Sequence, residues 1–325
     1  MLSIFVSSEE NDQTIISLMK RRFKSTPLSL IYKLLRTKKI LVNNNHCRYY
    51  HHRLKSGDEI NIDDEKIKSF DLGIDSFPVK PDLELKIVYE DKNLLIVVKD
   101  HNVEINKDNE KNCLDNQVKY HIYQQEPELY QKKTGAFFSI NALHRLDKLT
   151  KGLVIYAKNA LAKKLLYNAI QNKHKISKSY LAVCESFQLN SKPPLKVQGF
   201  IHKNEIKQKM EFNLERTDKN NFSDKTCSLQ IKEIFKQKKY QLLKITLDTG
   251  RKHQIRAILS FLQMPVIGDR KYGSEIRLSS KIYLFAYLLE FNDLPSPLNY
   301  LNGKIFQISS LQKELESAIR KEFFT

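Results

Sequence analysis

Tryptophan is absent from this chain of 325 residues, and cysteine occurs only four times. The cysteines lie far apart and form no C-x-x-C pair, so we expect free thiols in a reducing cytoplasm at Cys47, Cys113, Cys184 and Cys227. A metal site could be imagined only around a short His- and Cys-containing stretch, residues 46–52. Its spacing fits no standard zinc pattern, and we expect no bound metal.

Long apolar runs are also missing. No stretch approaches the roughly 20 apolar residues of a membrane-spanning helix. The opening residues, MLSIFVSSEEND, turn polar and acidic too soon for a signal peptide. No Walker or dinucleotide-binding fingerprint is present. We therefore expect a cytoplasmic protein with no membrane partner.

Acidic residues are outnumbered, with 37 Asp and Glu against 55 Lys and Arg, which leaves a formal net charge of +18. A surplus of this size favours a polyanionic partner, most commonly nucleic acid. Two stretches lack acids altogether: Lys20–Lys55 holds eleven Lys and Arg, and Lys148–Cys184 holds eight Lys. Solvated surfaces normally mix both signs, so we interpret these stretches as phosphate-binding. The excess of Lys, Asn and Ile is also typical of an AT-rich genome, so codon usage contributes to the charge.

The first predicted unit covers residues 1–65. Apolar residues recur at helical spacing from Ile15 to Phe23, and a second short helix is predicted with Ser29 as its N-cap. KILVNN indicates a strand and a turn, and RLKSGDEINI indicates two short strands around a Ser-Gly-Asp turn. Two basic helices followed by small strands resemble the S-four-type RNA-binding domain of ribosomal proteins. That resemblance implies RNA contacts from Arg36, Lys38 and Lys39.

Residues 66–84 show no clear periodicity and are predicted to be a linker, and residues 85–325 form the second predicted unit. LKIVYEDKNLLIVVK predicts a hairpin, and the polar stretch Asn106–Gln131 predicts a long surface loop. A helix capped by Asn159 and a strong amphipathic helix after Gly250 follow further along the chain. Strands and helices mix without regular alternation, so we predict an α+β fold with a mostly antiparallel sheet.

Two polar segments could carry chemistry. HRLDKLTKGLVIYAKN, residues 144–159, places Asp147 beside Arg145 in a polar turn before an apolar strand. A single Asp in such a turn is most often structural. The second segment, residues 249–273, gathers cations at the start of a helix, at Arg251, Lys252, His253 and Arg256. These side chains offer donors to phosphate, and Arg256 could pair with a carboxylate.

Taken in order, HRLDxxTxGL, KxYxA, GRxHQIR and PxxGDxxYG resemble the motifs of the RluA-type RNA pseudouridine synthases. With the N-terminal unit included, the chain is most similar to the RluC-like branch of that family, over about Gln13 to about Phe306. The resemblance implies an enzyme that isomerises specific uridines in RNA, and 23S ribosomal RNA of the large subunit is the expected substrate. RNA would be its partner, and we expect a monomer.

The resemblance also implies roles for single residues. The Asp of HRLD, the essential catalytic residue of the family, is Asp147 here. The Tyr of KxY, which stacks on the target base, is Tyr180, and the Arg of HQIR, which pairs with the catalytic carboxylate, is Arg256. Arg145 would help to displace the target nucleotide. Further RNA contacts are expected from His144, Arg251, Lys252 and His253.

The chemistry is consistent with that set of residues. Moving a base from a C–N to a C–C glycosidic bond needs no redox change and no energy input, so we expect no cofactor. It needs one ionised carboxylate, which an adjacent Arg favours. It also needs a base that is flipped out of its stack and held by an aromatic face. Attack on the sugar, attack on the base ring and proton abstraction all remain open.

Two other functions stay open on the sequence alone: a tRNA-directed synthase, and a non-catalytic RNA-binding or ribosome-assembly factor on the same scaffold. The joint presence of Asp147 and its two partners favours the enzyme, and the N-terminal unit favours ribosomal RNA. Three positions depart from the family pattern and bear on substrate choice. They are Asp100 where Pro is usual, Lys151 where Ser is usual, and Phe285 where His is usual.

Overall fold

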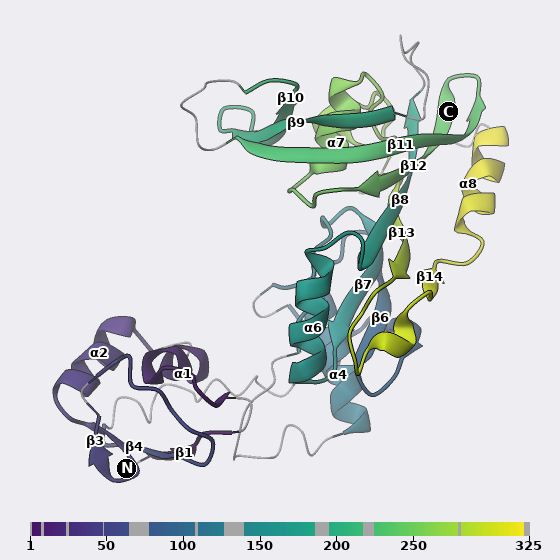
Figure 1. Cartoon of the computed structure of the whole chain (residues 1–325). Helices are drawn as coiled ribbons and strands as arrows, with labels where there is room; N and C mark the ends of the chain where they lie inside the picture. The colour runs from purple at the N-terminus through teal and green to yellow at the C-terminus, as the bar shows by residue number, and fades with distance from the viewer. Residues whose placement is uncertain are drawn as a thin grey trace. The chain divides into compact units, whose positions relative to one another are not determined.

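The computed structural model describes residues 2–7, 10–23, 26–47, 49–64, 78–107, 110–126, 140–185, 195–216, 224–278 and 281–321. The chain forms two compact units (Figure 1). One consists of Met1–Asp82 and Asn116–Ile140, and the other of Leu83–Asp115 and Asn141–Thr325. The predicted linker lies outside the described residues as far as residue 77. No helix within the described ranges is long and apolar enough to cross a membrane.

The first unit is built on an antiparallel sheet with strand order β1-β4-β2-β3. Its strands are β1 (Leu2–Phe5), β2 (Ile40–Val42), β3 (Asn45–His46) and β4 (Glu59–Ile62). Two helices, α1 (Ile15–Arg22) and α2 (Leu28–Arg36), bury their apolar faces in one core with β2 and β4. The periodic apolar residues of the two helices therefore pack as the sequence predicts.

Two local predictions in this unit are wrong. Helix α2 begins at Leu28 directly after Pro27, so Ser29 lies in its first turn and does not cap it. The fixed φ of proline suits a helix start without any side-chain cap. Before the Ser-Gly-Asp turn, Arg53 forms only an isolated bridge to Thr14, and the segment contributes the single strand β4.

The second unit is built on a large sheet with strand order β10-β9-β11-β12-β8-β13-β7-β6-β5, and β14 pairs with β13. Within the described ranges, the strand pairings of this sheet are antiparallel except that of β7 with β13, which confirms the α+β class and the mostly antiparallel sheet. The strands are β5 (Lys86–Glu90), β6 (Leu94–Lys99), β7 (Lys151–Ala157), β8 (Ile176–Glu185), β9 (Leu195–Asn204), β10 (Lys209–Asn213), β11 (Lys225–Gln237), β12 (Tyr240–Leu247), β13 (Leu284–Phe291) and β14 (Ile305–Gln307).

Strand β13 lies between β7 and β8, although it comes late in the sequence. Ala286 pairs with Gly152 of β7 on one side and with Tyr180 of β8 on the other. A Cβ atom at Gly152, whose φ is 149°, would collide with the backbone of Ala286, so glycine permits the close approach of the two strands. β13 therefore connects the strand that follows Asp147 to the strand that carries Tyr180.

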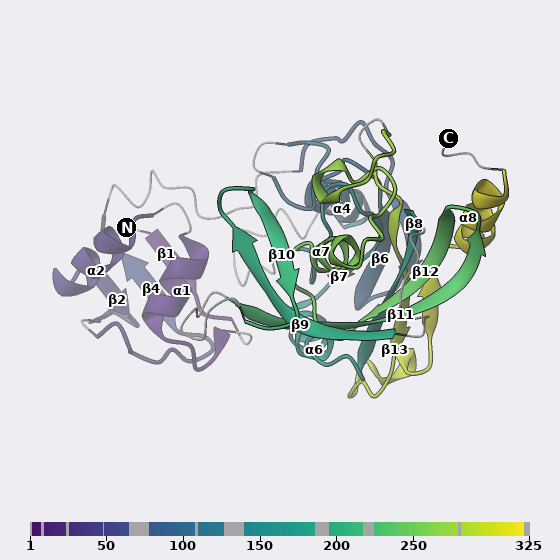
Figure 2. The same cartoon turned by 90° about the horizontal axis from the view of Figure 1, so that it is seen from above.

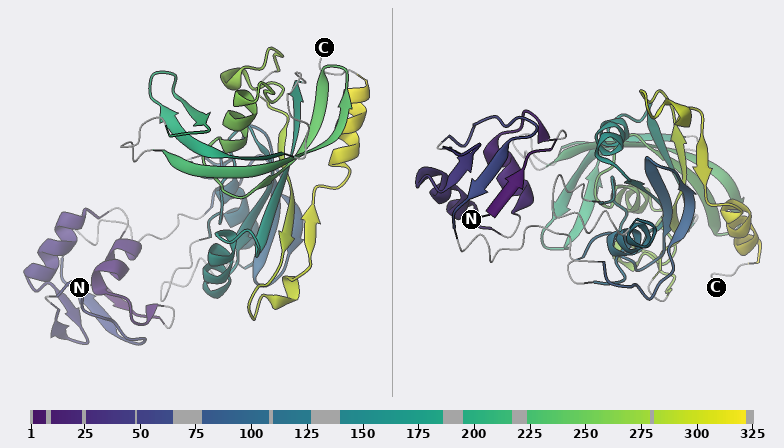
Figure 3. Two further views of the ribbon diagram at one scale, coloured as in Figure 1. Left: turned by 45° about the horizontal axis from the view of Figure 1, so that its top comes forward. Right: turned by 90° about the horizontal axis from the view of Figure 1, so that it is seen from below.

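Helices flank this sheet at several places. Helix α6 (Ala160–Ile170) packs against β7 and β8, and Asn159 caps it as predicted, accepting a hydrogen bond from the Ala162 amide at 2.8 Å. Helix α7 (Gln254–Phe261) lies beside β10 (Figure 2), and α8 (Leu311–Arg320) beside β11 and β12 (Figure 3). All four cysteines are buried and free.

The predicted surface loop over Asn106–Gln131 is wrong, because it contains helix α4 (Leu114–Gln125). Leu114, Val118 and Ile122 recur every four residues and are buried. The three apolar positions stand in an otherwise polar stretch, which is why the sequence pattern did not reveal the helix.

Candidate active site

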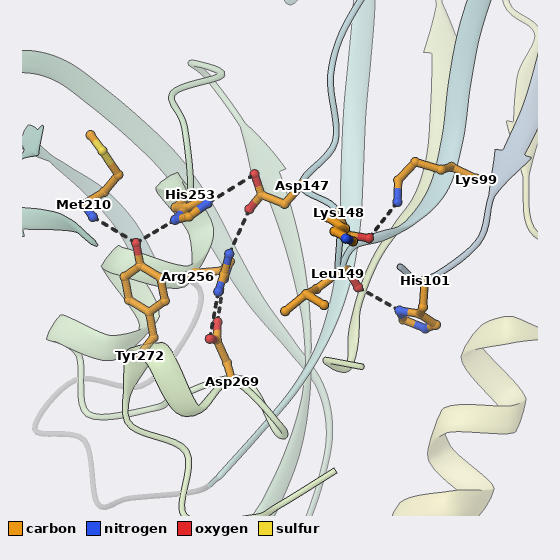
Figure 4. A network of polar contacts seen from close by, with 10 residues as sticks. All are labelled: Lys99, His101, Asp147, Lys148, Leu149, Met210, His253, Arg256, Asp269 and Tyr272. Carbon is orange, nitrogen blue, oxygen red and sulfur yellow. Dashed lines mark hydrogen bonds and ion pairs between the residues drawn. The ribbon is translucent and has the colours of Figure 1, made fainter. Parts of the chain in front are cut away.

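Asp147 lies in the loop before β7, with 24% of its side chain exposed. Its Oδ2 accepts a hydrogen bond from Nη1 of Arg256 at 3.3 Å, and its Oδ1 lies 3.7 Å from Nε2 of His253 (Figure 4). Arg256 is 109 residues away in the sequence. The contact that the motifs predict between these two residues is therefore present.

Arg256 is held on its other side by a second carboxylate. The side chain, 4% exposed, projects from α7 and donates from Nε and Nη2 to both oxygens of Asp269, at 2.6 and 2.9 Å. The ring of Tyr272 lies 4.7 Å from the guanidinium carbon. Burial alone would lower the pKa of Arg256, but the hydrogen bonds and charge of Asp269, together with Asp147, raise it. Arg256 therefore stays positively charged.

His253 precedes α7 with a left-handed backbone, φ 52°. Its Nδ1 lies 2.9 Å from the hydroxyl of Tyr272, and that hydroxyl accepts a hydrogen bond from the Met210 amide at 3.1 Å (Figure 4). Burial lowers the pKa of His253 to about 4, although the charge of Asp147 opposes the shift. The imidazole beside Asp147 is therefore neutral at pH 7.

Tyr180 lies on β8 in the middle of the sheet and is 7% exposed. It lines a cavity of about 490 Å³ together with Asp147, His253 and Arg256. Burial, and then the charge of Asp147, raise the pKa of Tyr180, so its phenol stays protonated. The structure thus brings the three predicted catalytic residues to one cavity.

The other expected RNA contacts of this unit also lie around Asp147. Arg145 is exposed, and with Arg251 it lines both this cavity and an adjoining one of about 920 Å³ that Lys252 also lines. His144 differs, because its Nε2 accepts a hydrogen bond from the Ile155 amide at 3.3 Å, and burial lowers its pKa to about 3. His144 is therefore a neutral link between the loop and β7.

The remaining candidates belong to the first unit. Arg36 is the last residue of α2, and Lys38 and Lys39 lie in the turn before β2. All three side chains are exposed, and Lys39 forms an ion pair with Asp64 at 3.3 Å. They are available for contact with a polyanion.

Sequence reasoning missed two residues that hold the Asp147 loop from behind. Lys99 is fully buried at the end of β6, and its ammonium donates to the carbonyls of Asp100, Val103 and Lys148 at 2.9, 2.8 and 3.0 Å. Burial lowers its pKa to about 8. His101 donates from Nδ1 to the Leu149 carbonyl at 2.7 Å (Figure 4). A signal for Lys99 existed, since it shares a buried face of β6 with Leu95 and Val97, four and two residues earlier.

The three departures from the family pattern are neighbours in space. Lys151 and Asp100 form an ion pair at 2.9 Å, and Phe285 is paired with Lys151 across the β7–β13 ladder. The ring of Phe285 also meets the ring of His101 edge-on, with centroids 5.5 Å apart. These substitutions therefore form one cluster behind the Asp147 loop, and none of them replaces a cavity residue that the motifs define.

Metal-ligating groups do not gather here. The part of the chain that the structure describes contains no group of three or more His, Cys, Asp or Glu side chains that could hold a metal ion. The chemical groups of the site are thus a carboxylate, a buried arginine, a neutral histidine, a tyrosine and surrounding cations.

Comparison with known proteins assigns the chain that carries this site to a family. A model of the RNA pseudouridylate synthase family matches residues 93–261. An RNA pseudouridine synthase of Mycoplasma capricolum is 38% identical over 307 residues, which cover 94% of this chain and 96% of the relative. The chain belongs to the RNA pseudouridylate synthase family, and the protein is an RNA pseudouridine synthase, an isomerase.

Other relatives narrow the assignment to the RluA type and its RluC-like branch. The ribosomal large subunit pseudouridine synthase C of Buchnera aphidicola is 31% identical over 277 residues, 83% of this chain and 80% of the relative. The protein of the same name from Rickettsia conorii is 30% identical over 312 residues, 91% and 92% of the two chains. The human RNA pseudouridylate synthase domain containing 4 shares the fold, with a TM-score of 0.55 and 19% identity over 73% of this chain and 93% of that structure.

Proposed function

We propose that this enzyme isomerises uridines in 23S ribosomal RNA and that Asp147 is its catalytic residue. The observation that supports the assignment of Asp147 most strongly is its ion pair with Arg256 inside a cavity that Tyr180 also lines. A buried cation next to a carboxylate favours its ionised form. An ionised carboxylate is the group that attack on the sugar, attack on the base and proton abstraction all require.

The remaining residues take roles that follow from their positions. In the reaction, the bond from ribose to the ring nitrogen breaks and a bond from ribose to a ring carbon forms, while one proton leaves that carbon and one joins the nitrogen. Tyr180 offers its ring to the detached uracil. Arg145, exposed at the cavity, helps to displace the target nucleotide, and Arg251 and Lys252 bind phosphate.

The choice of substrate is supported by two features. Relatives that cover most of the chain are named large-subunit synthases, and the first unit exposes Arg36, Lys38 and Lys39. Phosphate contacts of this kind position a protein on a large RNA without reading its bases. The enzyme would act as a monomer in the cytoplasm, with RNA as its partner.

Asp147→Asn tests the catalytic assignment. The amide is nearly isosteric, so folding and RNA binding should survive, but it can act neither as a nucleophile nor as a base. We expect no pseudouridine after extended incubation of the variant with a 23S RNA transcript, and filter binding unchanged within about twofold. Asp293→Asn, a change at an exposed carboxylate of the same unit, should retain the parental rate. Turnover of Asp147→Asn within about tenfold of the parent, a barrier change of only ~1.4 kcal/mol, would contradict the assignment.

A second experiment tests the substrate. Pseudouridines can be mapped chemically in total RNA from a strain that lacks the gene. Signals lost from 23S RNA and restored by the parental gene, but not by the Asp147→Asn gene, are the expected result. Loss confined to tRNA would instead identify a tRNA-directed synthase.

A further inference from the structure

The turn that follows α7 places two buried side chains behind the partners of Asp147. Residues 268–273 form this turn, with the short helix η2 (Arg270–Tyr272) at its centre. Asp269 and Tyr272 are 1% and 2% exposed. Neither is among the described residues that line the two cavities, so any effect on the reaction must pass through other side chains.

Asp269 fixes the orientation of Arg256. Its two oxygens accept from Nε and Nη2, which leaves Nη1 directed toward Asp147. A planar guanidinium that is held at two points by a carboxylate cannot rotate about its axis. The direction of Nη1, and with it the position of Oδ2 of Asp147, is therefore set by Asp269.

The hydroxyl of Tyr272 determines which nitrogen of His253 we expect to carry the proton. Burial raises the pKa of Tyr272 to about 12, so its hydroxyl keeps its hydrogen. The hydroxyl oxygen accepts from the Met210 amide, and its hydrogen is best donated to Nδ1 of His253. The hydrogen bond made at one ring nitrogen decides which nitrogen is protonated. A neutral His253 then carries its proton on Nε2, the atom that faces Oδ1 of Asp147.

The backbone of the turn supports this placement. Gly268 has a φ of 84°, and a Cβ atom there would collide with the carbonyl of Lys281. The Asp269 amide donates to the Val266 carbonyl, and the Tyr272 amide donates to the Asp269 carbonyl. A tight turn anchored in this way holds both side chains at fixed positions beneath α7.

We propose that Asp269 and Tyr272 are positioning residues for Asp147, Asp269 through Arg256 and Tyr272 through His253. The inference rests on the proposed function, because it assumes that Asp147 performs the chemistry. Oδ2 of Asp147 then faces Nη1 of Arg256, whose direction Asp269 sets. Oδ1 faces Nε2 of His253, which Tyr272 leaves as the protonated nitrogen. An orientation held in advance in this way lowers the cost of reaching the reactive geometry.

Two conservative substitutions separate positioning from substrate binding. Tyr272→Phe keeps the ring against Arg256 and removes the hydroxyl, whereas Asp269→Asn keeps the shape and removes the charge. A misplacement of a reacting group by about 1 Å can cost about 100-fold in rate. We expect kcat to fall by that factor, with KM and the RNA dissociation constant within about twofold of the parent.

Matched controls are available at the β5–β6 turn. Asp91 accepts hydrogen bonds from the hydroxyls of Tyr89 and Tyr300, away from the cavity. Asp91→Asn and Tyr300→Phe remove comparable hydrogen bonds and should retain the parental kcat. Asp269→Glu keeps the carboxylate but lengthens the side chain, and should also lower kcat. It decides the role of Asp269 if Asp269→Asn does not fold.

A spectroscopic measurement tests the Tyr272 contact without any catalysis. In nitrogen-15 NMR of labelled histidines, the signal of His253 is assigned by its disappearance in His253→Gln. That signal should show the Nε2–H tautomer in the parent and a mixture of tautomers in Tyr272→Phe. An Nδ1–H tautomer in the parent would overturn the role of Tyr272. Parental kcat in both the Asp269 and Tyr272 variants, with Asp147→Asn inactive, would overturn positioning and leave the proposed function intact. An active Asp147→Asn would instead reject the catalytic role of Asp147 on which this inference rests.

Discussion

His253 and His144 stand in the wall of a basic cavity, yet both are uncharged at neutral pH. Burial is the main cause in each case, and nearby cations add to it: Lys178 for His144, and Arg256 with two lysines for His253. The negative charge of Asp147 only partly offsets these effects at His253. The fixed positive charge of the cavity therefore comes from arginine and lysine, and the histidines serve as directed hydrogen-bonding groups.

This has a measurable effect on stability. In the unfolded chain His253 takes up a proton near its ordinary pKa of 6.5, whereas in the folded protein it does so only near 4. Between these values the unfolded state binds more protons, so stability is lost as the pH falls from about 6.5 to about 4. We expect His253→Gln to weaken the dependence of the melting temperature on pH over this window. His174→Gln, at an exposed histidine, should leave it unchanged. An identical slope in parent and His253→Gln would contradict the expectation.

At the scale of elements, the Asp147 loop is held by the end of β6 and the residues after it. Lys99 and His101 bind the carbonyls of Lys148 and Leu149, the two residues that directly follow Asp147. The loop thus has anchors behind it and the Arg256 ion pair in front of it. The geometry of the loop depends on the buried ammonium of Lys99, which donates to the backbone carbonyls of Asp100, Val103 and Lys148.

Lys99→Met tests this anchor. The variant fills a similar volume but leaves three partly buried carbonyls without their donor, which should cost about 3 kcal/mol in unfolding free energy. Because Lys148 is one of the three, kcat should also fall while RNA binding changes little. Denaturant unfolding and steady-state kinetics measure the two effects. Lys86→Met, at an exposed lysine that pairs with Asp100, should change both by much less. Unchanged kcat in a destabilised Lys99→Met would restrict Lys99 to a structural role.

The acid-free basic stretches show where sequence reasoning ended. In the stretch 148–184, Lys158 pairs with Glu90 at 2.7 Å and Lys173 with Asp248 at 3.1 Å. In the stretch 20–55, Arg21 and Arg22 pair with the buried carboxylate of Glu10. The acids are distant in sequence or lie outside the stretch, and only the fold brings them near. Some cations of each stretch therefore pair with carboxylates of the protein, and the prediction that both stretches wholly bind phosphate is too broad.

The family motifs predicted the contacts of the site more closely than the charge pattern did. The contact between Asp147 and Arg256 followed from two short segments that the family resemblance connects, and strand and helix periodicity gave the mostly antiparallel α+β fold. The roles of Asp269 and Tyr272 did not follow, because a hydrogen bond between side chains leaves no periodic pattern. The motif PxxGDxxYG includes both residues, at Asp269 and Tyr272, but it identifies no partner for either side chain. Sequence alone thus marked the two residues but not the contacts that they make.

At the scale of the whole molecule, the chain combines a small unit with exposed cations and a larger unit with the cavity. Arg36, Lys38 and Lys39 lie in the small unit, and none of them is needed for its core. The predicted division at residues 1–65, 66–84 and 85–325, and the S-four-type assignment of the first unit, remain predictions. Together these predictions imply that the small unit supplies affinity for RNA and that the larger unit supplies the chemistry.

Replacing Arg36, Lys38 and Lys39 together by Gln tests that division of labour. If each contacts a phosphate, the slope of log affinity against log salt should fall by about 2 to 3 in total. KM for 23S RNA should rise, while turnover at saturating RNA should stay near the parental value. Lys232, Lys236 and Lys313, exposed on the other unit, provide a control variant with the same loss of charge. Equal effects of the two triple variants would attribute binding to net charge alone.

The position of β13 has a consequence for the order in which a ribosome makes this protein. Asp147, Tyr180 and Arg256 are all synthesised before β13, yet β13 joins β7 to β8 at the centre of the sheet. Until that strand has emerged, the nascent chain contains Asp147, Tyr180 and Arg256 but lacks the strand that connects the two sides of the cavity. Because domains acquire native pairing as units during synthesis, the site forms only after β13 has emerged. A newly made chain therefore becomes active only once residues 284–291 have left the ribosome.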